Sequence, residues 1–405
     1  MSPFYGSFPL VRAPHRLFFF AGILLLMVAL LFWSVNRMDA AGLLSMPQTA
    51  WPAGWIHVFL IAYGALPFFM GGFLLTAMPR WQNYPELTTP DVALAWSLLV
   101  FGWLAIGVGF FCTSELVSAG CFLLILGWLL VLRLLWKIAR HSHPNRLHAH
   151  VVSSAATLGL TGFISWFIFS LNGHAFFAIW AIQVGMWLFL APIFLTVCHR
   201  MIPFFSQGVL APYVVVGPGW ALGVLLGSLL LHVITTLFLN PAWAWPANLV
   251  GAAVAFWLSL KWQWRRSLAV PLLGMLHIGF GWLGVGLLLL GVQNTLWHFT
   301  GHVWLGLAPM HALSLGFFLS LTYAMVSRVS LGHSGNPLRA NPWMWYSFLM
   351  LQLAICLRLF GEFFSSPVQA MLNFVSVAMV CLIFMIWAFY FLPIYLRTRR
   401  DGKPG

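Results

Sequence analysis

The sequence contains very few charged residues. Asp and Glu contribute only 6 of its 405 residues and Lys and Arg another 19, so charged residues make up 6% of the chain. A typical soluble domain carries about 25% charged residues. Hydrophobic residues make up 62%, and the mean hydropathy is +0.94. This composition excludes a soluble protein and predicts an integral membrane protein.

Carboxylates are especially scarce, and only Glu362 falls inside a predicted membrane span. Proton-coupled transporters and pumps generally rely on membrane-embedded Asp or Glu, so this scarcity disfavours a secondary transporter. The 5 cysteines form no CxxC pair and no grouping typical of a metal site.

Twelve apolar runs are long enough to cross a bilayer as helices, which takes about 20 residues. They are much longer than the roughly 10-residue strands of a membrane barrel. We therefore predict an all-α, polytopic membrane protein whose residues 1–405 form a single transmembrane domain with short loops. The predicted spans are Leu17–Val35, Trp55–Met78, Val92–Phe111, Leu116–Lys137, Val151–Leu171, Phe176–Val197, Val214–Leu239, Trp243–Leu260, Val270–Val292, Val303–Val326, Met344–Phe364 and Val368–Leu396.

The basic residues indicate the orientation of these spans. With the N-terminus inside, all of the 19 Lys and Arg residues except Arg37 and Arg358 fall on the cytoplasmic face. Cytoplasmic loops of membrane proteins are enriched in Lys and Arg, so both termini are predicted to be cytoplasmic. Because these charges lie at span ends, we interpret them as topology signals rather than a nucleic-acid surface. The expected macromolecular environment is the lipid bilayer, with no nucleic-acid partner.

Two of the 14 histidines, His277 and His311, lie deepest in the predicted spans. An imidazole in hydrocarbon needs a partner, a metal or a cavity, and neutral imidazole is the usual protein ligand of haem iron and copper. Both residues are therefore candidate ligands or ligand-orienting groups, the alternative being a hydrogen bond to a neighbouring helix. His57 and His302, towards the outer face, are candidate second ligands. His15 and His333 fall at cytoplasmic ends, where solvent or headgroup contact is expected.

The depths of the two deep histidines leave two arrangements open. Counting 1.5 Å per residue from the cytoplasmic ends places His277 about 12 Å and His311 about 25 Å into the bilayer. A single bis-histidine haem would then require strongly tilted helices. In the other arrangement, each histidine serves a different centre.

Arg358 and Glu362 are four residues apart and would meet on one helix face. Their spacing predicts a local ion pair near the outer end of the eleventh span. In a second reading, Arg358 faces an anionic cofactor group such as a haem propionate.

Several motifs resemble those of one known family. The nearest matches are MHALSLG at 310–316 and SRVSLGHSGNPL at 327–338. Shorter matches are PHRLFF at 14–19, GFLLTAMP at 72–79, RMIPFF at 200–205 and the PLL and LH of 271–277. Together they resemble the NnrS family of polytopic membrane proteins. The resemblance implies haem, copper, the bacterial cytoplasmic (inner) membrane and a role in the response to nitric oxide.

One departure from the family pattern concerns the second span. The family typically has His-x-His-Glu there, whereas this chain has His57 followed by Phe59 and Leu60 at the second histidine and the glutamate. The resemblance makes His57, His277 and His311 the candidate metal ligands. The substitutions put copper binding in doubt and leave haem at His277 and His311 least affected.

Three classes of function remain. The first is a haem protein, with or without copper, that acts on nitric oxide, senses it or protects against it; enzymatic oxidoreductase activity is left open. The second is a respiratory oxidoreductase of the haem-copper type, disfavoured because no span contains adjacent histidines or a His-Pro-Glu-Val stretch. The third is a secondary transporter without haem.

Overall fold

All regular secondary structure in the described part of the chain is helical. The computed structural model describes residues 8–141 and 146–400, and Lys403, one of the basic residues counted above, lies outside them. Within these residues there is no strand, and 12 helices are long and apolar enough to cross a membrane. The predicted all-α polytopic fold is thereby confirmed.

The chain forms two compact units. Unit 1 comprises Met1–Ile193, His333–Asn336 and Ala388–Gly405, and unit 2 comprises Phe194–Gly332 and Pro337–Trp387. The elements from the N-terminus to the unit boundary are η2 (Pro9–Arg12), α1 (Pro14–Ala40), α2 (Ala53–Phe59), η3 (Leu60–Ala65), α3 (Leu66–Trp81), α4 (Thr89–Gly109), α5 (Ser114–Ala139), α6 (Leu147–Asn172), α7 (Ala175–Gln183), η4 (Val184–Leu190) and α8 (Ala191–Gln207).

Helix α8 continues into unit 2, and α14 and α16 each run from unit 2 into unit 1. The remaining elements are α9 (Gly219–Phe238), η5 (Pro241–Ala244), α10 (Trp245–Lys261), α11 (Trp264–Ser267), α12 (Pro271–Thr300), α13 (Ala308–His311), η6 (Ala312–Leu319), α14 (Ser320–His333), α15 (Pro342–Phe360), η7 (Gly361–Phe363) and α16 (Val368–Leu396).

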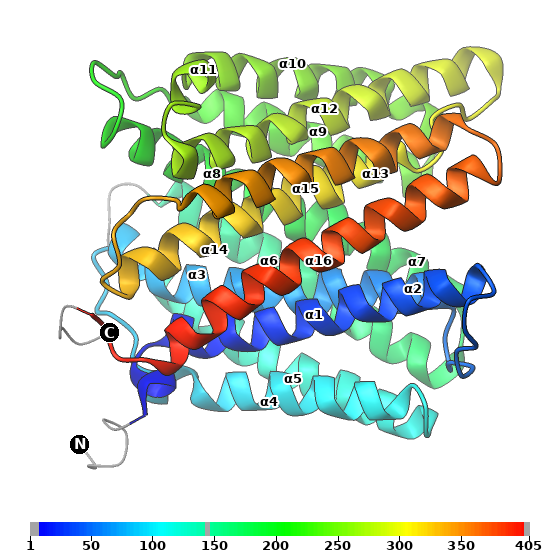
Figure 1. Ribbon diagram of the computed structural model, residues 1–405, viewed down its shortest axis with the longest axis horizontal. Coiled ribbons are helices and arrows are strands. Elements are labelled where there is room, and N and C mark those ends of the chain that lie inside the picture. Colours follow the sequence, from blue (N-terminus) through cyan, green and yellow to red (C-terminus); the bar gives the residue numbers. More distant parts are fainter. Residues whose placement is uncertain (1–7, 142–145, 401–405) are drawn as a thin grey trace. The chain divides into compact units, whose positions relative to one another are not determined.

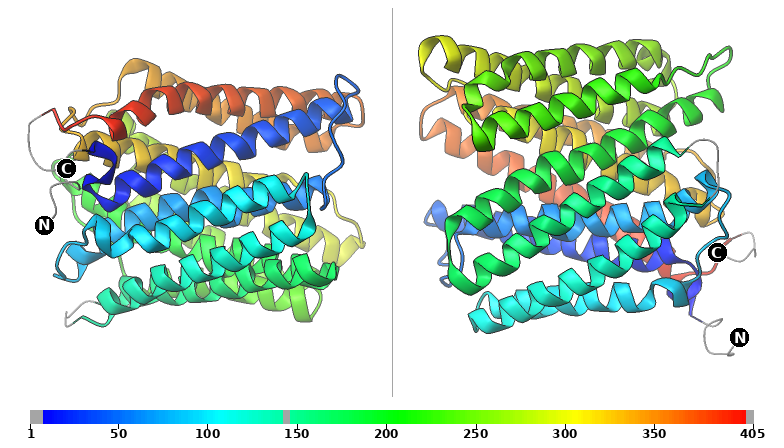
Figure 2. Two further views of the ribbon diagram at one scale, coloured as in Figure 1. Left: turned by 90° about the horizontal axis from the view of Figure 1, so that it is seen from below. Right: turned by 180° about the vertical axis from the view of Figure 1, so that it is seen from behind.

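Within unit 1, α4 and α5 pack unusually closely. They run side by side in both ribbon views (Figures 1 and 2). A Cβ atom added at Gly120 would lie 2.6 Å from the carbonyl oxygen of Gly102, so the two backbones approach without side chains between them. Small residues allow this approach in membranes, where helix association depends on packing rather than on the hydrophobic effect.

Within unit 2, α12 packs against η6 and α14 in an antiparallel arrangement with a defined register. A Cβ atom at Gly286 would contact Leu313, and one at Gly279 would contact Leu321. Residues earlier in α12 therefore lie level with residues later in α14. This register determines how far apart His277 and His311 lie along the axis of α12.

Three spans contain π-helical segments: the second at Leu60–Ala65, the sixth at Val184–Leu190 and the tenth at Ala312–Leu319. These are also the three most buried spans of the described chain. Widened π-helical turns occur frequently at functional sites. The third of them follows directly after His311.

The tenth span begins later than its hydropathy predicts, at Ala308 rather than Val303. The cause is the local backbone conformation at two glycines, together with the position of a proline. Gly301 caps α12 in the left-handed conformation at φ +73°, Gly306 has φ +48°, and Pro309 occupies the first turn of the new helix. The apolar residues from Val303 to Leu305 therefore belong to a connecting loop.

Candidate functional site at the start of the tenth span

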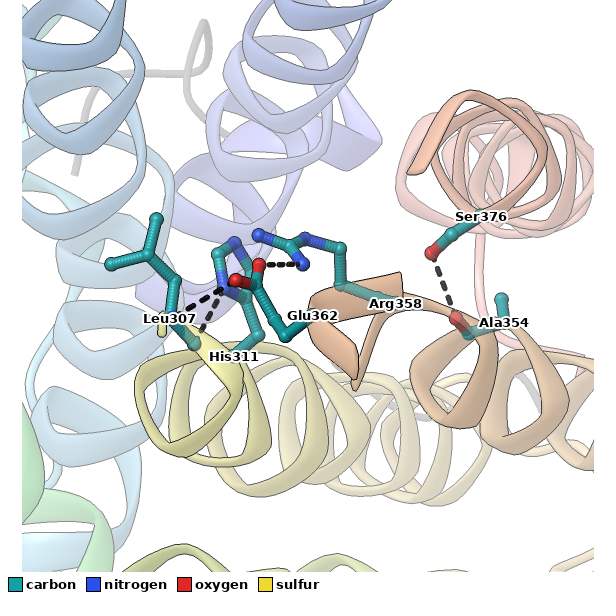
Figure 3. Close-up of polar contacts among 6 residues, drawn as sticks. All are labelled: Leu307, His311, Ala354, Arg358, Glu362 and Ser376. Carbon is teal, nitrogen blue, oxygen red and sulfur yellow. Dashed lines mark hydrogen bonds and ion pairs between the residues drawn. The ribbon is translucent and has the colours of Figure 1, made fainter. Parts of the chain in front are cut away.

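His311 is the fourth residue of its helix, so it lies in the first turn, whereas the predicted span beginning at Val303 placed it in the third turn. Its Nδ1 is 3.0 Å from the carbonyl oxygen of Leu307 (Figure 3). A carbonyl only accepts, so Nδ1 carries the proton and donates. The lone pair of a neutral ring is then on Nε2, which has no hydrogen-bond partner among the described residues. The backbone thus fixes both the tautomer and the orientation of the ring.

An ion pair lies beside this ring. Arg358 Nη1 is 2.5 Å from Glu362 Oε1, and both side chains are only 10% exposed. The ion pair expected from the i,i+4 spacing is therefore present. Arg358 is also close enough to act electrostatically on His311. Figure 3 shows the imidazole, the carboxylate and the guanidinium gathered at this end of the helix.

Glu362 connects the ion pair to the loop before His311. Its Oε2 accepts the backbone N–H of Leu307 at 3.3 Å, while the carbonyl of the same residue holds His311. A Cβ atom at Gly306 would collide with the Glu362 carboxylate. On the far side of α15, the Ser376 hydroxyl of α16 donates to the Ala354 carbonyl at 2.7 Å (Figure 3). Loop, α15 and α16 together make a rigid frame for the histidine.

His277 occupies a different level of unit 2. The α12 register places it beside Tyr323 and places His311 beside Leu288, a separation of about 11 residues or 16 Å along α12. Two imidazole nitrogens on one metal lie about 4 Å apart, because each metal–nitrogen bond is about 2 Å long. Of the two arrangements left open by the sequence, only separate centres fit this geometry.

The surroundings of His277 are closed. It is 3% exposed, and its Nε2 lies 3.1 Å from the Ser206 hydroxyl. Its Nδ1 is buried and has no hydrogen-bond partner in the described structure. The Ser206 contact, between residues far apart in sequence, carries no motif by which sequence reasoning could have found it.

The sequence makes both His57 and His302 candidate second ligands, but their surroundings in the structure differ. In unit 1, the ring of His57 stacks on Trp33 at 4.4 Å, and the Arg37 guanidinium covers the same indole at 4.5 Å. In unit 2, His302 lies in the exposed loop before α13, edge-on to Trp304. The first is held by an aromatic stack, and the second faces outward from the helices.

A family model for the NnrS protein matches residues 9–399, which is nearly the whole chain. This chain belongs to the NnrS family. The match includes the His311 helix, the 327–338 turn and the Arg358–Glu362 pair. No curated protein matches the sequence.

In the second span, this chain has Phe59 and Leu60 in place of the second histidine and the glutamate of the NnrS pattern. Both side chains pack in an apolar environment. Phe59 is fully buried, and its ring lies 4.8 Å from those of both Trp103 and Trp166. Leu60 is 5% exposed. These two side chains offer no metal ligand.

The imidazole of His311 has the form usual for a metal-ligating histidine. An oriented imidazole with a bound Nδ1 is the usual form of a metal-ligating histidine, and His311 has it beside a buried arginine suited to a carboxylate. By contrast, no group of three or more His, Cys, Asp or Glu side chains lies together in the described part of the chain. A copper site with three such ligands is therefore not provided by these residues.

Proposed function

We propose that this NnrS-family protein binds haem in the bacterial cytoplasmic membrane and serves the response to nitric oxide. His311 is the proposed axial ligand. The observation that carries this assignment is its ring geometry, in which the Leu307 carbonyl binds Nδ1 and Nε2 is left as the donor atom. Family membership supports the haem and the nitric oxide context.

Each neighbouring residue has a defined part in this proposal. The Leu307 carbonyl fixes the tautomer and the orientation of the imidazole, and Glu362 binds both the Leu307 amide and the Arg358 guanidinium. The Arg358 charge is paired with Glu362 through Nη1, and the remaining guanidinium N–H groups are the proposed donors to an anionic group such as a haem propionate. Bound haem would supply an iron able to take a small ligand such as nitric oxide.

His277 belongs to a second, separate part of the proposal. Its distance from His311 along α12 assigns it to another centre or to the orientation of groups around Ser206. His57, in unit 1, remains a proposed second ligand, as the family resemblance implies. His302, in its exposed loop, is the weakest candidate ligand of the set. Copper has no donor set among the described residues and enters the proposal only through the family.

The test is pyridine-haemochrome analysis and visible spectroscopy of purified wild type, His311→Ala, His277→Ala and the control His302→Ala. Each variant must first be shown to be folded and membrane-inserted. Wild type is expected to carry haem and to change its visible spectrum when nitric oxide is added without oxygen. His311→Ala should lose most of this haem, and His302→Ala should keep it. Full retention in His311→Ala with an unchanged spectrum contradicts the axial-ligand assignment.

The same preparation separates the alternatives. Consumption of nitric oxide or oxygen with an added electron donor would make the protein an oxidoreductase, whereas a spectral change without turnover indicates a sensing or protective role. Absence of haem from correctly folded wild type would favour a transporter. Metal analysis of the same samples measures copper.

A further inference from the structure

Two histidines that are far apart in the sequence lie together in unit 1. His15 is the second residue of α1, and His333 is the last residue of α14. Their ring centroids are 4.5 Å apart with an interplanar angle of 51°. Each belongs to one of the motifs that carry the family resemblance, yet neither sequence position suggests the other as a neighbour.

His15 is buried and incompletely bonded. It is 2% exposed, and its Nδ1 has no hydrogen-bond partner in the part of the chain that the structure describes. A buried polar atom without a hydrogen-bond partner destabilises the folded protein. A ligand that hydrogen-bonds to this nitrogen would remove that cost.

The pair lies in a strongly cationic environment. Arg16, Arg80 and Arg399 all act electrostatically on His15. Arg16 is 2% exposed. Its Nη1 donates to the carbonyl oxygens of Pro9, Tyr395 and Arg397, at 3.1, 3.4 and 2.8 Å. These contacts hold the C-terminal end of α16 against the start of α1.

One carboxylate counteracts these charges. Glu86 lies 2.9 Å from Arg80 in an exposed ion pair and acts electrostatically on His333. Among the residues that the structure describes, three guanidinium groups and two imidazoles are therefore balanced by one carboxylate. A cation would be repelled from this cluster, whereas an anion would be attracted.

We propose that His15, His333 and Arg80 form an anion site that binds a phosphate group. The first turn of α1 contributes as well, because a helix N-terminus favours negative charge. Arginine matches the geometry of phosphate oxygens, and imidazole can donate a further hydrogen bond. The site is independent of the haem proposal, since every one of its groups belongs to unit 1.

The phosphate can come from two sources with the same chemistry. One is the headgroup of an anionic phospholipid in the adjoining leaflet, and the other is free phosphate in solution. Juxtamembrane basic residues attract anionic lipids. The two sources are distinguished by the form in which phosphate is supplied.

The experiment measures thermal unfolding of the full-length protein, because a ligand that binds only the folded state raises its midpoint. In micelles of a non-ionic detergent, inorganic phosphate is titrated against chloride at equal ionic strength. In nanodiscs, phosphatidylcholine alone is compared with phosphatidylcholine containing phosphatidylglycerol. The variants are His15→Gln and the exposed Arg80→Gln, and the matched control is His150→Gln, which removes another helix-end histidine of unit 1.

We expect wild type and His150→Gln to be stabilised by at least one source, and each site variant to bind it about tenfold more weakly. Stabilisation by inorganic phosphate identifies a soluble ligand, and stabilisation by phosphatidylglycerol alone identifies a lipid. The proposal is overturned if neither source stabilises wild type. It is equally overturned if folded Arg80→Gln and His15→Gln respond as wild type does.

Discussion

At the scale of single residues, the histidines of this protein differ in which ring nitrogen is bonded to the protein and which is left without a partner. In His311 a backbone carbonyl binds Nδ1 and leaves Nε2 as a donor atom, whereas in His277 a serine hydroxyl lies against Nε2 and Nδ1 is buried. Depth along a span, the criterion available from the sequence, does not contain this information. The hydrogen-bond partner is what separates a candidate ligand from a structural histidine.

Removal of the Glu362 charge should destabilise the end of unit 2 that carries His311. Glu362→Gln would leave the Arg358 guanidinium, only 10% exposed, without its counter-charge. Breaking a buried ion pair on one side costs about 3–5 kcal/mol. Chemical unfolding of Glu362→Gln, Arg358→Gln and the double variant measures this effect, and the double variant should lose less than the sum of the two. Strict additivity would show that the two groups do not interact.

The hydrogen bond between Ser206 and His277 should also be measurable. Ser206→Ala removes the hydroxyl from a site in which both residues are buried, and leaving a buried polar atom unsatisfied costs about 1–3 kcal/mol. The control is Ser118→Ala, because that exposed hydroxyl bonds only to a carbonyl of its own helix. An equal effect of the two substitutions on the unfolding free energy would argue against a special role of the His277 contact.

At the scale of helices, the sequence predicts where spans exist better than where they begin. A run of about 20 apolar residues has no alternative in a bilayer except a helix, so all 12 spans were predictable. The start of the tenth span was not, because Gly301, Gly306 and Pro309 act on the backbone while the intervening residues stay apolar. That error placed His311 in the third turn of the predicted helix, whereas it lies in the first turn.

The site was predictable only where its contacts are local. The spacing of Arg358 and Glu362 indicated their ion pair directly. The His15–His333 pair joins residues more than 300 positions apart, so no local sequence pattern indicates it. The π-helical segments were also missed, because an all-apolar buried helix has no polar face whose shift would reveal an inserted residue.

The close packing of α4 on α5 makes a prediction about individual glycines. Gly120→Ala would place a methyl group against the Gly102 carbonyl and force the backbones apart, at a cost of about 1–3 kcal/mol. Gly107→Ala is the control, because a Cβ atom there meets nothing within 4 Å. It should be neutral or slightly stabilising, since alanine favours helices over glycine by about 1 kcal/mol. Thermal unfolding in detergent compares them, and similar midpoints would contradict the close contact.

At the scale of the whole molecule, both chain ends belong to unit 1 and lie beside each other. Arg16, near the N-terminus, binds the carbonyl oxygens of Tyr395 and Arg397, near the C-terminus. An even number of spans brings the chain back to the side on which it started, which agrees with these bonds. The side that faces the cytoplasm is set by the positive charges, and it stays a prediction.

The native cysteines provide a direct test of that orientation. Cys112 follows α4 and is exposed, Cys121, Cys198 and Cys381 are buried, and Cys356 is partly buried. The distribution of Lys and Arg predicts that Cys112 faces outward and that the loop containing Leu338 faces the cytoplasm. A membrane-impermeant maleimide should therefore label Cys112 in intact spheroplasts.

The matched reporter for the other face is Leu338→Cys, an exposed position, in a Cys112→Ser background. Cys112→Ser alone gives the background labelling of the remaining cysteines. The Leu338→Cys protein should react only after the membrane is permeabilised, because its loop is surrounded by the basic residues that membrane insertion retains inside. Labelling of Leu338→Cys in intact spheroplasts, with Cys112 of the parent protected, would reverse the orientation. The helix ends that carry His311 and Arg358 would then face the cytoplasm.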